Sequence, residues 1–302
     1  MRKSILITGS NGFIGSHLAE KFSREGHKVC CMVRHSSDTT FLDGIKKEYV
    51  YGDFTCPATL PEAVKGMDEI YHLGGTVRVV DKKRFYDINT DGTGYLVDAV
   101  RKHNPDIEKF VYVSSQAAAG PGGKGPVSEY GKSKKAGEKK VRNIKRYSIL
   151  RPVAVYGPRD RDFLSIFKMA QKGIFLKPAG AGRLSFIHVK DCVEGIASVK
   201  PGEEKYLSDG NNYSWENVAK VLKKVIKEEL SIVVLPKFII KLAGEAGSAK
   251  AKITGKAAVL NRDKAREIIQ DWAVEDKNSK AKFSLYEGFT DTYNWYKRQG
   301  WL

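Results

Sequence analysis

The sequence contains few cysteines, and the four present are Cys30, Cys31, Cys56 and Cys192. Their separations do not match the spacing of metal ligands, so no metal site is expected. Cys30 and Cys31 lie in an apolar run in which neighbouring side chains would point to opposite faces of a strand. We therefore expect all four to be reduced cysteines of the core.

A long hydrophobic segment is also lacking near the amino terminus. Met1, Arg2 and Lys3 lead directly into the run Ser4 to Thr8, which is too brief for a signal peptide or a spanning helix. We therefore expect a cytoplasmic protein that has no membrane partner.

Acidic residues are scarce relative to basic ones, and the formal net charge is +17. Such an excess could serve nucleic-acid binding, because lysine and arginine neutralise phosphates. However, the sequence has no helix-turn-helix, zinc-finger or aromatic stacking pattern. Several lysines fall at helical spacing beside glutamate and glycine, as on a solvated helix face: Lys134, Lys135, Lys139 and Lys140. We therefore expect no nucleic-acid partner.

What the sequence does contain is a regular alternation of short apolar runs with helical patterns. The predicted strands are Ile5 to Thr8, Val29 to Val33, Tyr49 to Tyr51, Glu69 to Leu73 and Phe110 to Ser114. This order predicts an α/β fold, a doubly wound Rossmann sheet of parallel strands covered on both faces. A chain of 302 residues also leaves room for a second, smaller lobe.

The second half of the chain predicts a mostly helical lobe that binds the substrate. Helices are expected at Phe163 to Lys172 and at Trp215 to Ile226, with a strand at Leu184 to Val189 followed by a helix from Asp191. The predicted dinucleotide domain is therefore 1–155, returning at about 184–205, and the smaller lobe is 156–183 and 206–302. The apolar segment from Leu235 to Leu242 either forms a lid over an apolar substrate or packs as core, and packing is favoured.

A glycine-rich loop follows the first predicted strand and opens the first predicted helix. It reads Thr8-Gly9-Ser10-Asn11-Gly12-Phe13-Ile14-Gly15. Gly9 permits the tight turn, Gly12 lets the backbone approach a pyrophosphate, and Gly15 allows close packing of helix on sheet. The free N–H groups at the helix start bind the anion, so a nicotinamide dinucleotide is expected here rather than an unliganded turn.

The end of the second strand bears on the choice between NAD and NADP. An acidic residue there would bond both ribose hydroxyls of NAD, but this chain has Val33 followed by Arg34. A guanidinium binds a 2′-phosphate through a fork of donors, so NADP is favoured over NAD. The alternative is that Arg34 is merely a solvated residue.

In this order the motifs resemble the extended short-chain dehydrogenase/reductase family, which includes NAD(P)-dependent epimerases and dehydratases, dihydroflavonol reductases and steroid dehydrogenases. The resemblance spans nearly the whole chain. Besides the glycine loop, the motifs are Gly52-Asp53-Phe54, Tyr71-His72-Leu73-Gly74-Gly75, Asn89 with Gly92-Thr93, Val113-Ser114-Ser115, Tyr130-Gly131-Lys132-Ser133-Lys134, and Leu150-Arg151-Pro152 through Arg159.

The resemblance implies Ser115, Tyr130 and Lys134 as catalytic residues. Tyr130 and Lys134 are four residues apart on a predicted helix, so they share a face, and a nearby ammonium would lower the pKa of the phenol. Such a phenol exchanges a proton with a carbonyl oxygen, which Ser115 would also bond. The implied cofactor contacts are Gly9, Asn11, Gly12, Phe13, Ile14, Gly15, Arg34, Asp53, Phe54, Leu73, Gly74, Gly75, Asn89, Tyr130, Lys134 and Pro152.

Departures from the family pattern separate the functional alternatives. Ala154 stands where sugar-nucleotide epimerases commonly have an asparagine that bonds uridine diphosphate, and Lys190 replaces an acidic residue. A reductase or dehydrogenase acting on a carbonyl or secondary alcohol is therefore favoured. The alternative is a nucleotide-sugar epimerase or dehydratase with tightly bound NAD, in which Arg159, Arg161 and Arg183 hold the diphosphate. A non-catalytic dinucleotide sensor is disfavoured because Tyr130 and Lys134 are present. The expected partner is a small-molecule substrate, and the resemblance is compatible with a homodimer.

Overall fold

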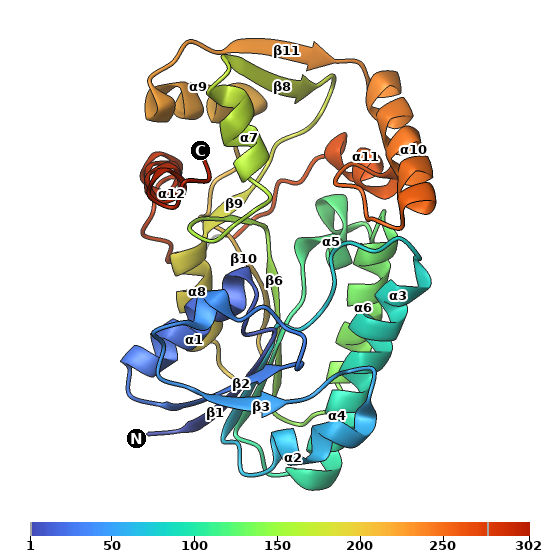
Figure 1. Cartoon of the computed structure of the whole chain (residues 1–302), viewed down its shortest axis with the longest axis vertical. Helices are drawn as coiled ribbons and strands as arrows, with labels where there is room; N and C mark the ends of the chain where they lie inside the picture. Colours follow the sequence, from blue (N-terminus) through green and yellow to red (C-terminus); the bar gives the residue numbers. More distant parts are fainter. Residues whose placement is uncertain (1, 277) are drawn as a thin grey trace. The chain divides into compact units, whose positions relative to one another are not determined.

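The computed structural model describes residues 2–276 and 278–302 (Figure 1). By their internal contacts the residues divide into two compact units. The first unit comprises Met1–Ala118, Glu129–Arg151 and Val193–Lys205, and the second comprises Ala119–Ser128, Pro152–Cys192 and Tyr206–Leu302. The assignment of substrate binding to the second unit stays a prediction.

A seven-stranded sheet forms the centre of the first unit, in the order β10-β6-β5-β4-β1-β2-β3. Its strands are β1 (Ser4–Thr8), β2 (Lys28–Val33), β3 (Glu48–Tyr51), β4 (Glu69–His72), β5 (Lys109–Val113), β6 (Tyr147–Pro152) and β10 (Glu204–Leu207). The strand β1 pairs in parallel with both β2 and β4, and β4 pairs in parallel with β5. This confirms the expected Rossmann-like sheet, with strand ends within about one residue of those expected.

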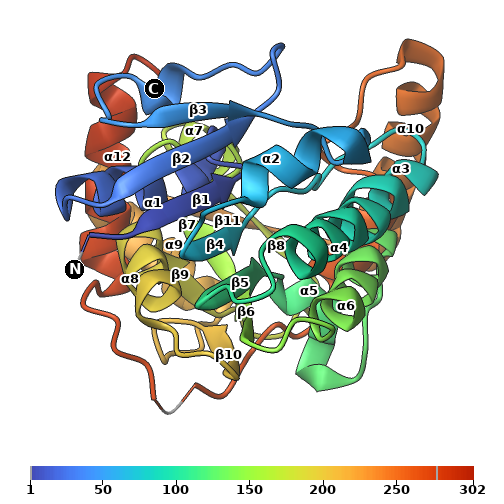
Figure 2. The ribbon, with the colours of Figure 1, turned by 90° about the horizontal axis from the view of Figure 1, so that it is seen from below.

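Helices cover both faces of this sheet. Helix α1 (Phe13–Arg24) and α8 (Val189–Ser198) lie on one face, and α2 (Leu60–Val64), α4 (Thr93–His103) and α6 (Glu129–Val141) lie on the other (Figure 2). Shorter turns connect them: α3 (Lys83–Tyr86), the π-helical turn Asp87–Gly92 and α5 (Gln116–Ala119). One hydrophobic cluster joins the sheet to the second group of helices through buried residues such as Leu6, Met32, Ile70, Leu96 and Phe110. The inner strands β1, β2, β4 and β5 are buried on both faces, which is why they show as apolar runs in the sequence, whereas the edge strands β3 and β10 are mostly exposed.

The second unit has its own aromatic core. Its helices are α7 (Leu164–Ala170), α9 (Trp215–Ile226), α10 (Lys237–Thr254), α11 (Arg262–Ile268) and α12 (Leu285–Arg298). Two strand pairs accompany them: β7 (Ala154–Tyr156) with β9 (Phe186–His188), and β8 (Ile174–Pro178) with β11 (Ser231–Leu235). Tyr156, Phe167, Phe289 and Tyr296 are buried together in this core. The expected helix Trp215 to Ile226 is confirmed, and a capping box at Ser214 fixes its start.

Three sequence-based expectations are wrong in the structure. Cys56 is exposed, because it belongs to a turn after β3, although Cys30, Cys31 and Cys192 are buried and all four thiols are free. Lys134 is not on a solvated face but is only 4% exposed, whereas Lys135, Lys139 and Lys140 are exposed. The segment Leu235 to Leu242 does not pack as core, since Phe238 and Leu242 are exposed and only Ile240 is buried.

Candidate active site

The glycine loop joins the carboxyl end of β1 to the amino end of α1, and its backbone accepts only glycine at two positions. Gly9 has φ +66°, and a Cβ there would lie 2.8 Å from the Gly74 nitrogen. A Cβ on Gly15 would lie 2.1 Å from the Gly9 carbonyl oxygen. Gly12 occupies the N-cap position of α1 and offers no side chain to the first-turn N–H groups. The loop therefore has the form of a cradle for a pyrophosphate at a helix amino end.

The ribose side of the predicted cofactor site lies at the ends of β2 and β3. Arg34 is exposed directly after β2, and its backbone N–H donates to the Ser37 hydroxyl at 3.1 Å. The neighbouring His35 ring stacks on Tyr51, with 4.0 Å between ring centroids and 9° between planes. Neither ring was singled out from the sequence, because nothing in the spacing of His35 and Tyr51 indicates that parallel pairing brings them together.

Asp53, Phe54 and Gly74 form a close-packed corner after β3 and β4. The Asp53 carboxylate accepts from the Thr55 N–H and hydroxyl, both at 2.8 Å. A Cβ on Gly74 would lie 2.4 Å from the Phe54 ring, so the ring requires glycine at that position. Leu73 and Gly75 flank Gly74 at the end of β4. The residue types inferred from the family resemblance are therefore matched to one another sterically.

Helix α6 carries Tyr130 and Lys134 one turn apart. The Lys134 Nζ donates to the Val113 carbonyl oxygen at 2.9 Å and lies 4.2 Å from the centroid of the Tyr112 ring. Burial lowers the pKa of Lys134 to about 7, although the nearby Glu138 carboxylate acts in the opposite direction. Tyr130 is half-buried and lies beside Phe85, with 6.0 Å between ring centroids.

The two serines after β5 differ in their partners. The Ser114 hydroxyl donates to Glu138 at 2.7 Å, and Arg151 holds the same carboxylate through two hydrogen bonds at 2.8 Å and 2.6 Å. Ser114 is thereby part of a buried structural network. Ser115 is half-buried, and its oxygen accepts from the Ala117 N–H at 3.1 Å.

Asn89 connects the π-helical turn to helix α6. Its Oδ1 accepts from the Thr76 N–H at 2.8 Å, and its Nδ2 donates to the Thr76 carbonyl oxygen and the Ser133 hydroxyl, both at 3.0 Å. Thr90 adds a hydrogen bond to the Ser133 carbonyl oxygen at 3.0 Å. Ser133 lies between Tyr130 and Lys134 in the sequence, so these contacts fix the helix that carries both.

A buried chain of hydrogen bonds links the glycine loop to Asn89, and sequence reasoning missed it. The Gly74 N–H donates to the Thr8 hydroxyl at 3.0 Å, and Thr8 lies 2.7 Å from His72 Nδ1. On the other side, His72 Nε2 lies 3.0 Å from the Thr93 hydroxyl, which donates to the Asn89 carbonyl oxygen at 2.8 Å.

Only one tautomer of His72 satisfies this chain. Thr93 uses its proton on Asn89, so it accepts from Nε2–H, and Thr8 therefore donates to Nδ1. Burial lowers the pKa of His72 to about 3, which keeps the ring neutral. A histidine at the end of a buried strand was visible in the sequence, but its two threonine partners come from other elements.

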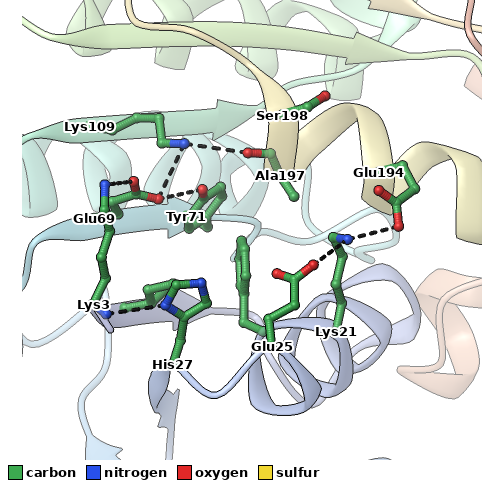
Figure 3. A pocket seen from close by; sticks show the side chains of 12 residues that line it. Lys3, Lys21, Glu25, His27, Glu69, Tyr71, Lys109, Glu194, Ala197 and Ser198 are labelled. Atoms are coloured by element: carbon green, nitrogen blue, oxygen red, sulfur yellow. Dashed lines mark hydrogen bonds and ion pairs between the residues drawn. The ribbon is translucent and has the colours of Figure 1, made fainter. Parts of the chain in front are cut away.

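A polar pocket lies at the other end of the same sheet, at the amino-terminal edge where its parallel strands begin (Figure 3). It has a volume of about 290 Å³ and is lined by β1, β4 and β5 together with α1 and α8. The Glu69 carboxylate lies in it, accepting from the Lys3 ammonium and the Tyr71 hydroxyl, both at 2.6 Å, and pairing with Lys109 at 3.2 Å. These charges are matched to one another, and none of the residues in the sequence-based site lines the pocket.

The predicted cofactor and catalytic residues of the first unit follow the carboxyl ends of its parallel strands or lie on α6 and the Asn89 turn. Pro152 ends β6 and is the residue at which the second unit resumes. Within the described ranges, no cluster of His, Cys, Asp and Glu has the size and geometry to hold a metal ion. No helix among those residues combines the length and apolarity required to span a bilayer.

A sequence model of the NAD dependent epimerase/dehydratase family matches residues 5–202. The chain belongs to this family. Its matched part includes the glycine loop, Ser115 and the Tyr130–Lys134 pair. Members of the family are NAD(P)-dependent enzymes that act on small molecules, so the coarse resemblance inferred from the motifs is confirmed.

Two curated relatives of equal identity carry different descriptions. A ceramide reductase of Caulobacter vibrioides is 30% identical over 313 residues, which cover 100% of this chain and 96% of that protein. An uncharacterized UDP-glucose epimerase of Bacillus subtilis is also 30% identical, over 87% of this chain and 94% of its own length.

Solved structures share the whole fold. The crystal structure of gox2253 superposes with a TM-score of 0.79 at 25% identity and covers 100% of both chains. The UDP-glucose 4-epimerase of Thermotoga maritima, solved with UDP-glucose, gives a TM-score of 0.77 at 20% identity over 98% of this chain and 99% of that one. At that identity the second likeness concerns the fold alone.

Proposed function

We propose that the protein is an NADP-dependent reductase or dehydrogenase that interconverts a carbonyl group and a secondary alcohol on a lipid-like substrate. The observation that carries this proposal is the arrangement on α6, where Tyr130 and the buried Lys134 share a helix face beside the end of β5. The full-length similarity to a ceramide reductase supports a substrate with long alkyl chains.

In the proposed reaction, one proton passes between the Tyr130 phenol and the carbonyl oxygen of the substrate. The nicotinamide cofactor, when bound, supplies the hydride in reduction or accepts it in oxidation. Tyr130 donates its phenolic proton to the carbonyl oxygen during reduction and recovers a proton from solvent afterwards. The Ser115 hydroxyl donates a hydrogen bond to the same oxygen and orients the carbonyl.

Lys134 has two roles in this proposal. Its ammonium, held by the Val113 carbonyl oxygen, favours the phenolate that remains after Tyr130 has released its proton. It also provides a donor for the nicotinamide ribose. Because burial lowers its pKa to about 7, the ammonium form is populated mainly below neutral pH in the cofactor-free chain.

The residues proposed to hold the dinucleotide fall into two groups. Gly9, Gly12 and Gly15 form the pyrophosphate cradle, whose steric demands fit a close backbone approach. Arg34, exposed after β2, would bind the 2′-phosphate of NADP. In a fluorescence titration, Arg34→Ala should weaken NADPH about tenfold and leave NADH nearly unchanged. Equal losses for both would reject the phosphate contact.

A nucleotide-sugar epimerase is the second candidate. Relatives described as UDP-glucose epimerases favour it, including one from Vibrio cholerae at 26% identity over 97% of this chain. Against it, Ala154 offers no amide to a uridine diphosphate. Arg161 is one of the basic residues that could hold a diphosphate. Its guanidinium carbon lies 5.4 Å from the centroid of the Trp301 ring.

Native mass spectrometry of the purified chain distinguishes the two. The reductase proposal expects an empty site, stabilisation by NADPH, and oxidation of NADPH that depends on a long-chain ketone. Retained NAD, together with epimerisation of a UDP-sugar and no ketone-dependent oxidation, would overturn it in favour of the epimerase.

A further inference from the structure

Helix α10 packs on the second unit by one face only. Ile240, Gly244 and Ala251 are buried on this face. A Cβ on Gly244 would lie 2.6 Å from the Ala265 Cβ, and one on Gly247 would lie 2.0 Å from the Leu260 carbonyl oxygen. These close approaches to α11 and to the loop before it fix the rotation of α10 about its axis. Its other face is therefore turned outward.

The outward face is apolar, which reverses the usual pattern of a surface helix. Phe238 is 64% exposed, Leu242 is 63% exposed and Ile253 is 86% exposed. At 100° per residue these three fall within about 60° of one another, with Ala246 and Ala249 on the same side. We call Phe238, Leu242 and Ile253 the α10 stripe.

The strand before the helix also exposes apolar side chains. Strand β11 pairs with β8 on one side only, in a two-stranded sheet. Ile232, Val233 and Val234 are 42%, 42% and 54% exposed, so both faces of β11 are uncovered. Because β11 ends at Leu235 and α10 begins at Lys237, exposed apolar side chains gather on two elements adjoining in the chain, which indicates an interaction site.

Lysines flank the stripe on both sides. Lys241 and Lys252 lie along one margin, Lys250 lies toward the other, and all are exposed. The one carboxylate in α10, Glu245, is engaged by the Arg262 guanidinium, with 2.6 Å between Nε and Oε1. The margins of the stripe are therefore positive, and the whole chain carries a net charge of +17.

We propose that the outward face of α10 docks on an anionic phospholipid surface. Phe238, Leu242 and Ile253 insert at the level of the acyl chains, and the lysines at the margins contact the headgroups. An apolar helix face bordered by lysines is the pattern of helices that lie on anionic membranes, and the net charge of +17 complements such a surface. The expectation of no membrane partner rested on the lack of a spanning segment, which does not bear on binding at the surface.

This inference goes beyond the proposed reaction and does not depend on it. A lipid-like substrate would be met at such a surface, but docking requires neither substrate nor cofactor. The binding experiment below uses vesicles without either, so its failure and the failure of the proposed function are separate results.

The test is flotation of the full chain with vesicles of phosphatidylglycerol and phosphatidylcholine, compared with phosphatidylcholine alone. We expect the protein to float with the anionic vesicles only. The double variant Phe238→Ser/Leu242→Ser should lower partitioning about tenfold or more, because two apolar side chains lose their insertion. Lys241→Gln/Lys252→Gln should lower it about fivefold for each lysine removed.

Matched controls use exposed residues of the first unit. Val77→Ser, at a position 61% exposed, and Lys102→Gln, on α4, should leave partitioning unchanged. All substituted side chains are exposed, so circular dichroism should show a retained fold. Ile253→Ser, at the far end of the stripe, provides a second apolar variant.

Two results would overturn the proposal. One is failure of the wild-type chain to float with anionic vesicles. Another is undiminished flotation of both the Phe238→Ser/Leu242→Ser and the Ile253→Ser variants. If the wild-type chain does not float and light scattering shows a dimer that those substitutions dissociate, the occupant is a second copy of the chain.

Discussion

In the seven-stranded sheet, the pKa of a lysine is shifted in opposite directions at the amino-terminal and carboxyl-terminal ends of the parallel strands. At the amino-terminal edge, the Glu69 carboxylate is surrounded by Lys3, Tyr71 and Lys109 (Figure 3). Hydrogen bonds to Glu108 and Glu69 raise the pKa of Lys3 to about 12. At the carboxyl-terminal edge, Lys134 is buried against a carbonyl oxygen and an aromatic ring, and its pKa is lowered to about 7.

The difference separates residues that stabilise the fold from residues that we propose take part in the reaction. A buried charge with matched partners keeps its ordinary protonation state across the physiological range and is expensive to disrupt. A buried amine without a bonded carboxylate can change its protonation state near neutral pH, which suits proton chemistry but lowers stability. The following variants test that contrast, from the largest expected effect to the smallest.

Tyr130→Phe should lower kcat about a thousandfold or more and leave cofactor affinity unchanged, because only the proposed proton donor is removed. Steady-state kinetics with a long-chain ketone and a fluorescence titration with NADPH measure the two effects. Tyr86→Phe is the matched control: its hydroxyl donates to Glu129, so turnover should persist. Full turnover by Tyr130→Phe would show that Tyr130, at the carboxyl-terminal edge, is not the proton donor.

Glu69→Ala, at the amino-terminal edge, should lower stability and leave turnover unchanged. It leaves the buried Tyr71 hydroxyl and the Lys109 ammonium without their carboxylate, and should lower the free energy of unfolding by about 3 kcal/mol. Urea denaturation measures this loss. Turnover of the folded fraction should be unchanged, and a selective loss of kcat would show that the two edges are functionally coupled.

Lys134→Met should lower kcat about a hundredfold while the folded state stays as stable or becomes more stable at neutral pH. The sign follows from proton binding: between about pH 7 and 10.5 the unfolded lysine holds a proton that the folded one lacks. Stability of the wild type should therefore rise with pH across that window, and the variant should lose this dependence. Denaturation curves at several pH values measure it, and a strongly destabilised variant would contradict the contrast.

Substitution of His72 should give the smallest effect. It changes stability in a pH range different from the range in which Glu69 acts. The pKa of His72 is lowered from 6.5 to about 3, so the unfolded ring takes up a proton that the folded ring refuses, and stability falls as pH drops below 6.5. The slope is at most about 1.4 kcal/mol per pH unit. Glu69, whose pKa is lowered from 4.5, loses its contribution only below that value. His72→Gln should flatten the denaturation profile between pH 6.5 and 4.5, and an unchanged profile would count against this assignment.

Much of the first unit could be predicted because its information is local. The strands are continuous apolar runs, and the helix after β1 shows its apolar spacing directly in the sequence. The pairing of Asn89 with Thr76 and Ser133 could not be predicted, because residues of three separate segments supply the donors and acceptors. The hydrogen-bond chain through Thr8, His72 and Thr93 was missed for the same reason.

Two of the three errors share a cause. Lys134 follows a lysine-rich helical pattern that indicates a solvated face, but the face on which it lies packs against Tyr112. The α10 stripe has the composition of a core segment, yet the close approaches at Gly244 and Gly247 turn the opposite face inward. In both helices the spacing identifies an amphipathic element without specifying which side is covered.

The amino-acid sequence alone determined the parallel sheet, the glycine loop and the family, since each depends on residue types at short, fixed separations along the chain. The tertiary structure alone decided which lysine is buried, which tautomer His72 adopts and which side of α10 is exposed. These properties depend on desolvation and on hydrogen-bond partners brought from distant segments, and neither is encoded in local spacing.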